Sequence, residues 1–229
     1  MGQTGGAGGR LVGLAAAAGS TSEPAAVVLL LHGGRAHSYD PVSRGNLAAA
    51  RMDALARGIR RERTLPVLAL RYRVRGWNDE GGSRTPDPVS DAWLALEAVE
   101  NGLGPVPVIL VGHSLGGRTA VRVAEYPTVR AVAALAPWLP PDEPVDPLAD
   151  RTLLVAHGRR DRVTDVGDSV AFATRASAVA DAVYLKVLDD GHAMLRRPGE
   201  WRRLVVRFAA LAAFGSSAGA LDADRVGGE

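Results

Sequence analysis

The chain has 229 residues, of which 47% are hydrophobic, and a formal net charge of +2. This length suits one domain with a substantial core, and the lack of cysteine excludes disulfides, thiolate metal sites and a cysteine nucleophile. Acidic residues accompany the arginines along almost the whole sequence, so it lacks the basic stripe of a nucleic-acid-binding protein.

The first 24 residues are rich in Gly, Ala, Ser and Thr, and we expect a flexible leader or an irregular edge strand there. The apolar run at 11–19 is short and weak for a signal peptide, and Arg10 is the only cation before it. No stretch is as long as a transmembrane helix. We therefore expect a cytoplasmic, bacterial protein that does not bind membranes, with secretion through a poor signal as the weaker alternative.

From residue 25 onward, apolar runs alternate with helical patterns. The runs are continuous, as expected for strands that are covered on both faces. They predict strands at residues 26–31, 67–72, 108–111, 129–135, 152–156 and 182–188. The helical spacing of apolar residues predicts helices that begin near residues 47, 87, 115, 165 and 201.

This alternation predicts one α/β domain over residues 25–214, a three-layer α/β/α sandwich with a mostly parallel sheet of about six strands. The proline-rich connection at 137–150 is too short for a cap domain, so we expect a minimal cap. The small, polar residues at 215–229 predict a disordered tail.

Two further expectations concern single side chains. Asp87 precedes a proline at a helix start and is expected to cap that helix. Arg118 and Arg122 lie four residues apart on one helix face, which we expect to be solvated.

A nucleophile motif follows the predicted strand at 108–111. Gly112-His113-Ser114-Leu115-Gly116 fits the G-x-S-x-G pattern, in which a sharp turn from strand to helix exposes the serine. A serine hydroxyl needs a base, and the base is usually oriented by a carboxylate. Ser114 is therefore a candidate nucleophile whose partners must be sought elsewhere in the chain.

The partners are expected after two later strands. Asp161 follows the strand at 152–156 and is assigned as the acid, while His192 follows the last strand and is assigned as the base. Asp165 or Asp168 could replace Asp161, but helix capping explains those two better. The other histidines do not follow the last strand. They are His32, His37, His113 and His157.

Taken in order, Gly112–Gly117, His157-Gly158 with Asp161, and Asp190-Gly191-His192 resemble the signature segments of the α/β-hydrolase superfamily. The resemblance covers roughly residues 26–214 and favours its small, nearly cap-less members that are similar to dienelactone hydrolases and esterases. The first two strands of the family's usual sheet are absent or reduced, because only about two dozen residues precede the first core strand.

The resemblance implies an α/β-hydrolase fold and a serine hydrolase that acts on small to medium carboxyl esters or thioesters, without a cofactor or metal. Alternatives are an acyltransferase, lyase, peptidase or amidase with the same triad, or a non-catalytic protein that binds a small ligand. The sequence does not specify an oligomeric state.

The oxyanion of such a site needs N–H donors. Leu115 follows the nucleophile and should supply one, and the family's His-Gly-x loop implies Gly34 as the other, with Arg35 second. We expect His32 to shape that loop.

Trp77 and Trp138 lie in loops at the catalytic edge, where they either line the substrate pocket or cover the core. Arg35 is a further candidate for substrate binding. The other arginines at this edge are expected in surface ion pairs rather than in an anion site. They are Arg73, Arg75, Arg159, Arg160 and Arg162.

Overall fold

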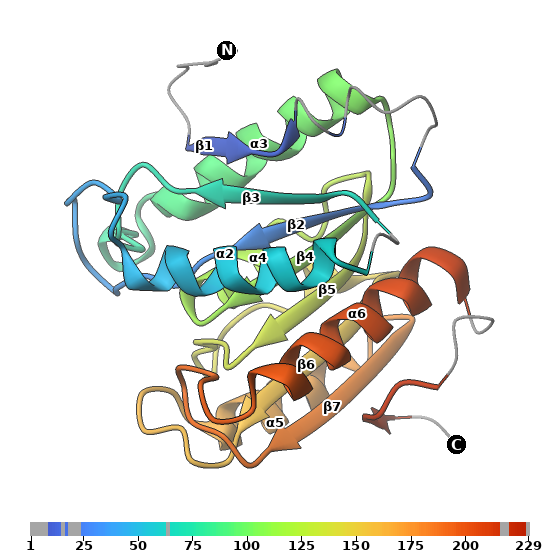
Figure 1. Cartoon of the computed structure of the whole chain (residues 1–229). Helices are drawn as coiled ribbons and strands as arrows, with labels where there is room; N and C mark the ends of the chain where they lie inside the picture. Colours follow the sequence, from blue (N-terminus) through green and yellow to red (C-terminus); the bar gives the residue numbers. More distant parts are fainter. Residues whose placement is uncertain (1–8, 15–16, 18–23, 63–64, 216–219, 228–229) are drawn as a thin grey trace.

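The computed structural model describes residues 9–14, 17, 24–62, 65–215 and 220–227 (Figure 1). Within these residues the strands form one eight-stranded sheet in the order β1-β3-β2-β4-β5-β6-β7-β8. The six central strands are parallel. They are β2 (Val27–Leu31), β3 (Val67–Arg71), β4 (Val108–His113), β5 (Val129–Leu135), β6 (Thr152–Gly158) and β7 (Ala182–Leu188).

Two short antiparallel strands complete the sheet, which raises the predicted number of strands from six to eight. β1 (Arg10–Val12) pairs with β3, and most of the remaining predicted leader lies outside the described residues. β8 (Asp224–Val226) pairs with β7. The expectation of a disordered tail is therefore wrong for residues 224–226. Such a strand carries little sequence signal, because its pairing with an existing edge uses backbone groups.

Helices cover both faces of the sheet, as predicted (Figure 1). α2 (Leu47–Arg60) and α6 (Pro198–Phe214) pack on one face. α3 (Asp87–Leu103), α4 (Leu115–Arg122) and α5 (Val166–Ala176) pack on the other. Alternate residues of β2 enter the two cores, and all five are fully buried. This explains why the strand is a continuous apolar run.

The helix starts show which capping predictions hold. Asp165 caps α5 by accepting a hydrogen bond from the Gly167 N–H at 2.7 Å. Asp87 does not cap α3, so that prediction is wrong. Its carboxylate instead accepts hydrogen bonds from Asn78 at 2.9 Å and from Arg84 at 2.7 Å.

The connection between β5 and β6 contains only a short 3₁₀ helix, Asp146–Leu148, which fits the predicted minimal cap. The same connection carries Glu143, which is buried and forms ion pairs with both Arg118 and Arg122. The expectation that these two arginines are solvated is wrong for Arg118, which is buried, and only partly right for Arg122. In the part of the chain that is described, no helix is both long and apolar enough to cross a membrane.

Candidate active site

The nucleophile motif forms a tight turn between β4 and α4. Ser114 has φ 56° and ψ −119°, a strained conformation for a residue with a side chain. The flanking glycines allow this turn to pack closely. A Cβ on Gly112 would lie 2.0 Å from the Gly116 carbonyl oxygen, and one on Gly116 would lie 2.3 Å from that of Leu31. The close packing of the turn therefore requires glycine at both positions.

The three residues assigned from the sequence lie together at the carboxyl edge of the sheet, where β4, β6 and β7 end. The Ser114 Oγ lies 3.1 Å from the His192 Nε2, and the His192 Nδ1 lies 2.8 Å from the Asp161 Oδ2. The side chain of His192 is 17% exposed and that of Asp161 is 1% exposed. The contacts form one hydrogen-bonded chain from hydroxyl through imidazole to carboxylate.

Asp161 is held by a larger set of donors than the sequence suggested. Its Oδ1 accepts hydrogen bonds from the backbone N–H groups of Val163 at 2.8 Å and Thr164 at 3.1 Å. The Thr164 hydroxyl donates to Oδ2 at 2.9 Å. Burial opposes ionisation of Asp161, but these donors and His192 outweigh it and hold its pKa below the ordinary value. The carboxylate is thus ionised at neutral pH.

His157 is a second histidine on the same carboxylate, and sequence reasoning missed it. Its Nε2 lies 3.2 Å from the Asp161 Oδ2, and its Nδ1 lies 2.7 Å from the Ser169 Oγ. Burial lowers the pKa of His157, which favours the neutral ring. The arrangement then assigns the Nε2–H as donor to Asp161 and the Nδ1 as acceptor from Ser169. The only sequence signal for this role was the place of His157 at the end of β6.

The predicted oxyanion loop passes beside the nucleophile. A Cβ on Gly33 would lie 3.4 Å from the Ser114 Cβ. Within the described residues, the N–H groups of Leu115 and Gly34 donate no hydrogen bond, so both are free to bind a ligand. The Arg35 N–H is already bound to the Arg75 carbonyl at 2.8 Å. This contact disfavours Arg35 as the second oxyanion donor.

His32 holds this loop, as expected. Burial lowers the pKa of His32 to about 4, so the ring is neutral at neutral pH. The Tyr72 N–H donates to its Nε2 at 3.2 Å, and its Nδ1–H donates to the Gly33 carbonyl at 2.7 Å. The Gly33 C=O and the Gly34 N–H share one trans peptide and point in opposite directions. Fixing the carbonyl therefore fixes the direction of the Gly34 N–H.

His113, within the elbow, holds the loop of the candidate base. Its Nε2–H donates to the His192 carbonyl at 2.8 Å. Burial and the neighbouring His192 lower the pKa of His113 to about 3, so this ring is also neutral. His37 is exposed.

The two tryptophans both contact the Arg118 guanidinium but differ in burial. Trp77 is 1% exposed, and the Arg118 guanidinium lies 4.1 Å from its ring centroid. It therefore covers the core, which is the second of the two roles expected for it, and this burial disfavours it as a pocket residue. Trp138 is half-buried, and its backbone N–H donates to the Ser114 carbonyl at 3.2 Å. It therefore lies beside the nucleophile and stays a candidate for the pocket wall.

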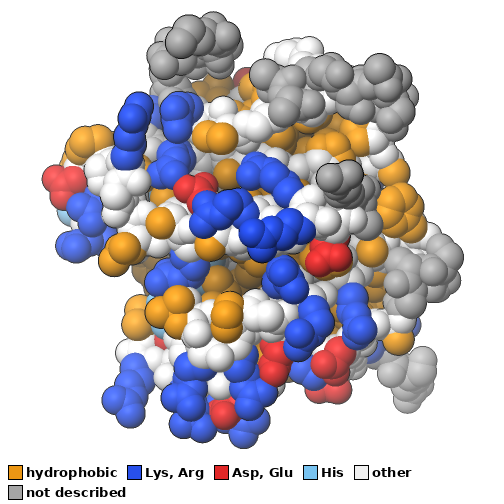
Figure 2. Space-filling model, in the orientation of Figure 1, with side chains coloured by type: hydrophobic (Ala, Val, Ile, Leu, Met, Phe, Trp, Pro, Cys, Tyr) orange, Lys and Arg blue, Asp and Glu red, His pale blue; other side chains and the backbone are white. Residues whose placement is uncertain are grey.

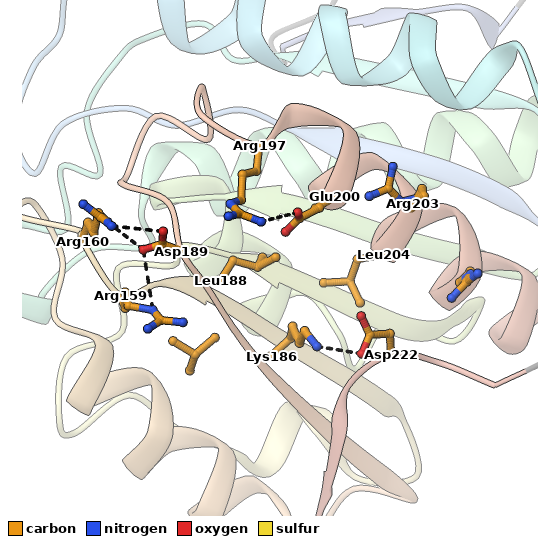
Figure 3. A pocket seen from close by; sticks show the side chains of 12 residues that line it. Arg159, Arg160, Lys186, Leu188, Asp189, Arg197, Glu200, Arg203, Leu204 and Asp222 are labelled. Atoms are coloured by element: carbon orange, nitrogen blue, oxygen red, sulfur yellow. Dashed lines mark hydrogen bonds and ion pairs between the residues drawn. The ribbon is translucent and has the colours of Figure 1, made fainter.

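Most arginines at this edge form the expected ion pairs. Arg73 contacts Asp91, and Arg75 contacts Asp40. Arg159 and Arg160 both contact Asp189 in a hollow of about 580 Å³ between β7 and α6 (Figure 3). The other two acids that line this hollow are also paired with cations, and Ser114, Asp161 and His192 are not among its lining residues. Among the described residues, no group of three His, Asp or Glu could hold a metal ion.

Comparisons with known proteins agree with this fold. The sequence matches the model of a family described as the alpha/beta hydrolase family over residues 28–227. A search of the curated proteins gives no match. The structure is similar to an alpha-beta serine hydrolase homologue from Coxiella burnetii, with a TM-score of 0.64, 22% identity, and coverage of 82% of this chain and 86% of that chain.

Two further structures are similar to a comparable degree. The Pyrococcus furiosus esterase Pf2001 has a TM-score of 0.62 and 18% identity, with coverage of 82% of this chain and 80% of that chain. Est1E from Butyrivibrio proteoclasticus has a TM-score of 0.59 and 16% identity, with coverage of 83% and 89%. At these identities the likeness concerns the fold, whereas the family match spans most of the sequence. The chain belongs to the alpha/beta hydrolase family.

Proposed function

We propose that the protein is a serine hydrolase that cleaves carboxyl esters or thioesters of small to medium substrates through an acyl-enzyme on Ser114. The observation that carries this proposal is the hydrogen-bonded chain from the Ser114 Oγ through His192 to Asp161. A serine alone is a weak nucleophile, and this chain provides the base and the group that orients it.

In the first step, His192 Nε2 takes the Ser114 proton as the Oγ attacks the substrate carbonyl. The ionised Asp161 stabilises the imidazolium that forms. Collapse of the tetrahedral intermediate expels the alcohol or thiol, which receives the proton from His192. In the second step, water attacks the acyl-enzyme with His192 as base, and the acid is released.

The oxyanion of each tetrahedral intermediate is assigned to the N–H groups of Leu115 and Gly34. Both are unbonded within the described residues and lie beside Ser114. One such donor contributes about 10² to 10³ in rate. Because His32 binds the Gly33 carbonyl, the Gly34 N–H keeps its direction while the charge develops, so little reorganisation is needed.

The substrate class is inferred from the surroundings of Ser114. The β5–β6 connection forms only a minimal cap, so no cap domain limits access to the site, which suits small to medium esters or thioesters. The similar structure Pf2001 is described as an esterase, which agrees with ester substrates. The open surroundings give no specific support to a peptidase or acyltransferase.

Labelling with a fluorophosphonate tests the proposal. The folded wild-type protein should be labelled on Ser114, and Ser114→Ala should lose both labelling and p-nitrophenyl butyrate hydrolysis by at least about 10⁴-fold. Ser177→Ala is the matched control, because this serine follows α5 at the opposite edge of the sheet. Folded wild-type protein that neither labels nor turns over short esters would instead indicate a binding protein on this fold.

A further inference from the structure

A groove of about 620 Å³ runs between α2 and α6 and is separate from the hollow beside β7. Figure 2 shows this face of the molecule, with arginine side chains over the two helices and hydrophobic side chains between them. The groove exists because α2 turns small residues, Ala50, Ala54 and Gly58, toward α6. Leu55 and Trp201 add apolar surface to its lining.

One end of the groove lies at the catalytic edge. Leu47 lines both the groove and a recess that contains Gly33 and Gly34 of the oxyanion loop. On the other side, Leu195 lines both the groove and a recess that contains His192. Leu47 is 81% exposed and Leu195 is 72% exposed. The groove therefore begins between the two loops that flank Ser114, with exposed leucines on both sides of its mouth.

All the charged residues that line the groove are arginines. Arg51, Arg61 and Arg202 line it, no acid lines it, and none of the three forms an ion pair within the described part of the chain. The Nε atoms of Arg51 and Arg202 are buried without a hydrogen-bond partner. The three guanidinium groups thus have no counter-charge in the groove, and their positive field attracts an anion.

The far end of the groove is partly closed by an arginine. A Cβ on Gly58 would lie 2.6 Å from the Cδ of Arg202, so the stem of Arg202 packs across the helix at this glycine. From Leu47 to Gly58, α2 rises about 16 Å, which is room for an apolar chain of medium length. Arg61 lies beyond Gly58 on the same lining. An acyl chain that enters between Leu47 and Leu195 thus meets the guanidinium groups of Arg61 and Arg202 at the far end of the groove.

We infer that the groove binds the acyl chain of the substrate and that Arg61 and Arg202 bind a carboxylate at the end of that chain. The inference rests on the proposed function and narrows its substrates to medium-chain esters or thioesters of acids with a second, ω-terminal carboxylate. Apolar burial holds the methylene chain, and the carboxylate supplies the counter-charge that the groove lacks.

The test compares three p-nitrophenyl esters: the acetate, the dodecanoate, and the mono-ester of dodecanedioic acid, which has twelve carbons and a free carboxylate. Wild-type kcat/KM should rise from acetate to dodecanoate and rise again, about tenfold, for the dodecanedioate mono-ester. In Ala54→Trp, which fills the groove, the dodecanoate-to-acetate ratio should fall about tenfold. In the double variant Arg61→Gln/Arg202→Gln, only the dodecanedioate-to-dodecanoate ratio should fall.

Matched controls separate these effects from general perturbation. Leu94→Trp adds the same ring to an exposed position of α3, on the opposite face of the sheet, and Arg57→Gln removes an arginine of α2 that does not line the groove. Both should keep the wild-type ratios. If Ala54→Trp does not fold, Ala50→Leu replaces it as the filling variant. Ratios that are unchanged in the groove variants, or changed equally in the controls, would overturn the inference.

Binding measurements distinguish failure of the groove from failure of the proposed chemistry. Dodecanoate and dodecanedioate are titrated into Ser114→Ala by calorimetry, with Ser114→Ala/Ala54→Trp as control. If dodecanedioate binds more tightly than dodecanoate and Ala54→Trp removes this binding, the groove is supported even if no ester is hydrolysed. Ester hydrolysis without dodecanedioate binding would leave the proposed function intact and overturn the groove.

Discussion

Two buried carboxylates in this molecule have similar exposure and different partners. The side chains of Asp161 and Glu143 are 1% and 0% exposed, and each accepts several hydrogen bonds. Glu143 receives the guanidinium groups of Arg118 and Arg122. The partners of Asp161 are two backbone N–H groups, a hydroxyl and two imidazoles, and no arginine is among them.

This difference separates a structural carboxylate from a catalytic one. Two arginines neutralise Glu143, so no net negative charge remains there for chemistry. Neutral donors stabilise the charge on Asp161 without cancelling it. That charge therefore remains available when His192 becomes an imidazolium. Burial and the number of partners do not distinguish the two sites, whereas the charge of the partners does.

The largest expected effect is the loss of activity in Asp161→Asn. The asparagine Oδ1 can still accept from Val163 and Thr164, so the loop should stay folded, but the negative charge is lost. We expect kcat for p-nitrophenyl butyrate to fall about 10⁴-fold, with a moderate fall in the thermal midpoint because the ionised side chain also stabilises the fold. An active Asp161→Asn enzyme would show that the uncancelled charge is not what defines this site.

Glu143→Gln should lower the stability of the protein and leave its activity almost unchanged. It leaves two guanidinium groups without their counter-charge, one of them buried, so we expect the free energy of unfolding to fall by about 3 kcal/mol. The value is at the low end for a broken buried pair because the Arg122 side chain is 33% exposed. Urea unfolding measures this loss, and kcat of the folded fraction should stay close to the wild-type value. A stable but inactive variant would contradict the structural role.

The fold was predicted well wherever burial on both faces leaves a continuous apolar run. The strand at 129–135, which is almost wholly buried, has the predicted bounds. The strand at 182–188 also has them, although most of its residues are only half-buried. β1 fits the edge strand that was one of the two expectations for the first 24 residues, whereas β8 was not predicted. Each is three residues long, and its pairing leaves no apolar pattern.

Side-chain partners were harder to predict than strands. Glycine spacing and strand order were enough to bring Ser114, Asp161 and His192 together. The spacing of Arg118 and Arg122 correctly placed them on one helix face, but only the packed fold shows that the β5–β6 connection brings Glu143 against that face. His157 likewise contacts Asp161 through the turn after β6, a geometry with no sequence motif of its own.

A smaller effect is expected from His157, which acts as a positioning residue. In His157→Ala one donor to Asp161 is lost, and we expect kcat to fall about tenfold, as for the loss of roughly 1.4 kcal/mol from a hydrogen bond to a charged group. His157→Gln can donate from its amide and should recover part of the rate. A purely structural role predicts lower stability in both variants without this recovery of kcat.

The smallest effect concerns stability at acid pH. The pKa of Asp161 is held below its ordinary value of 3.8 in the folded protein, so its ionised form stabilises the fold above the unfolded pKa. This contribution is lost as pH falls through the folded pKa. Urea midpoints measured from pH 7 to pH 3 should therefore fall more steeply below pH 4 for the wild type than for Asp161→Asn, which has no carboxylate to protonate. Parallel curves would mean that the donors around Asp161 favour the charged and the neutral side chain equally. The charge of the partners would then not distinguish Asp161 from Glu143, and only their positions in the fold would.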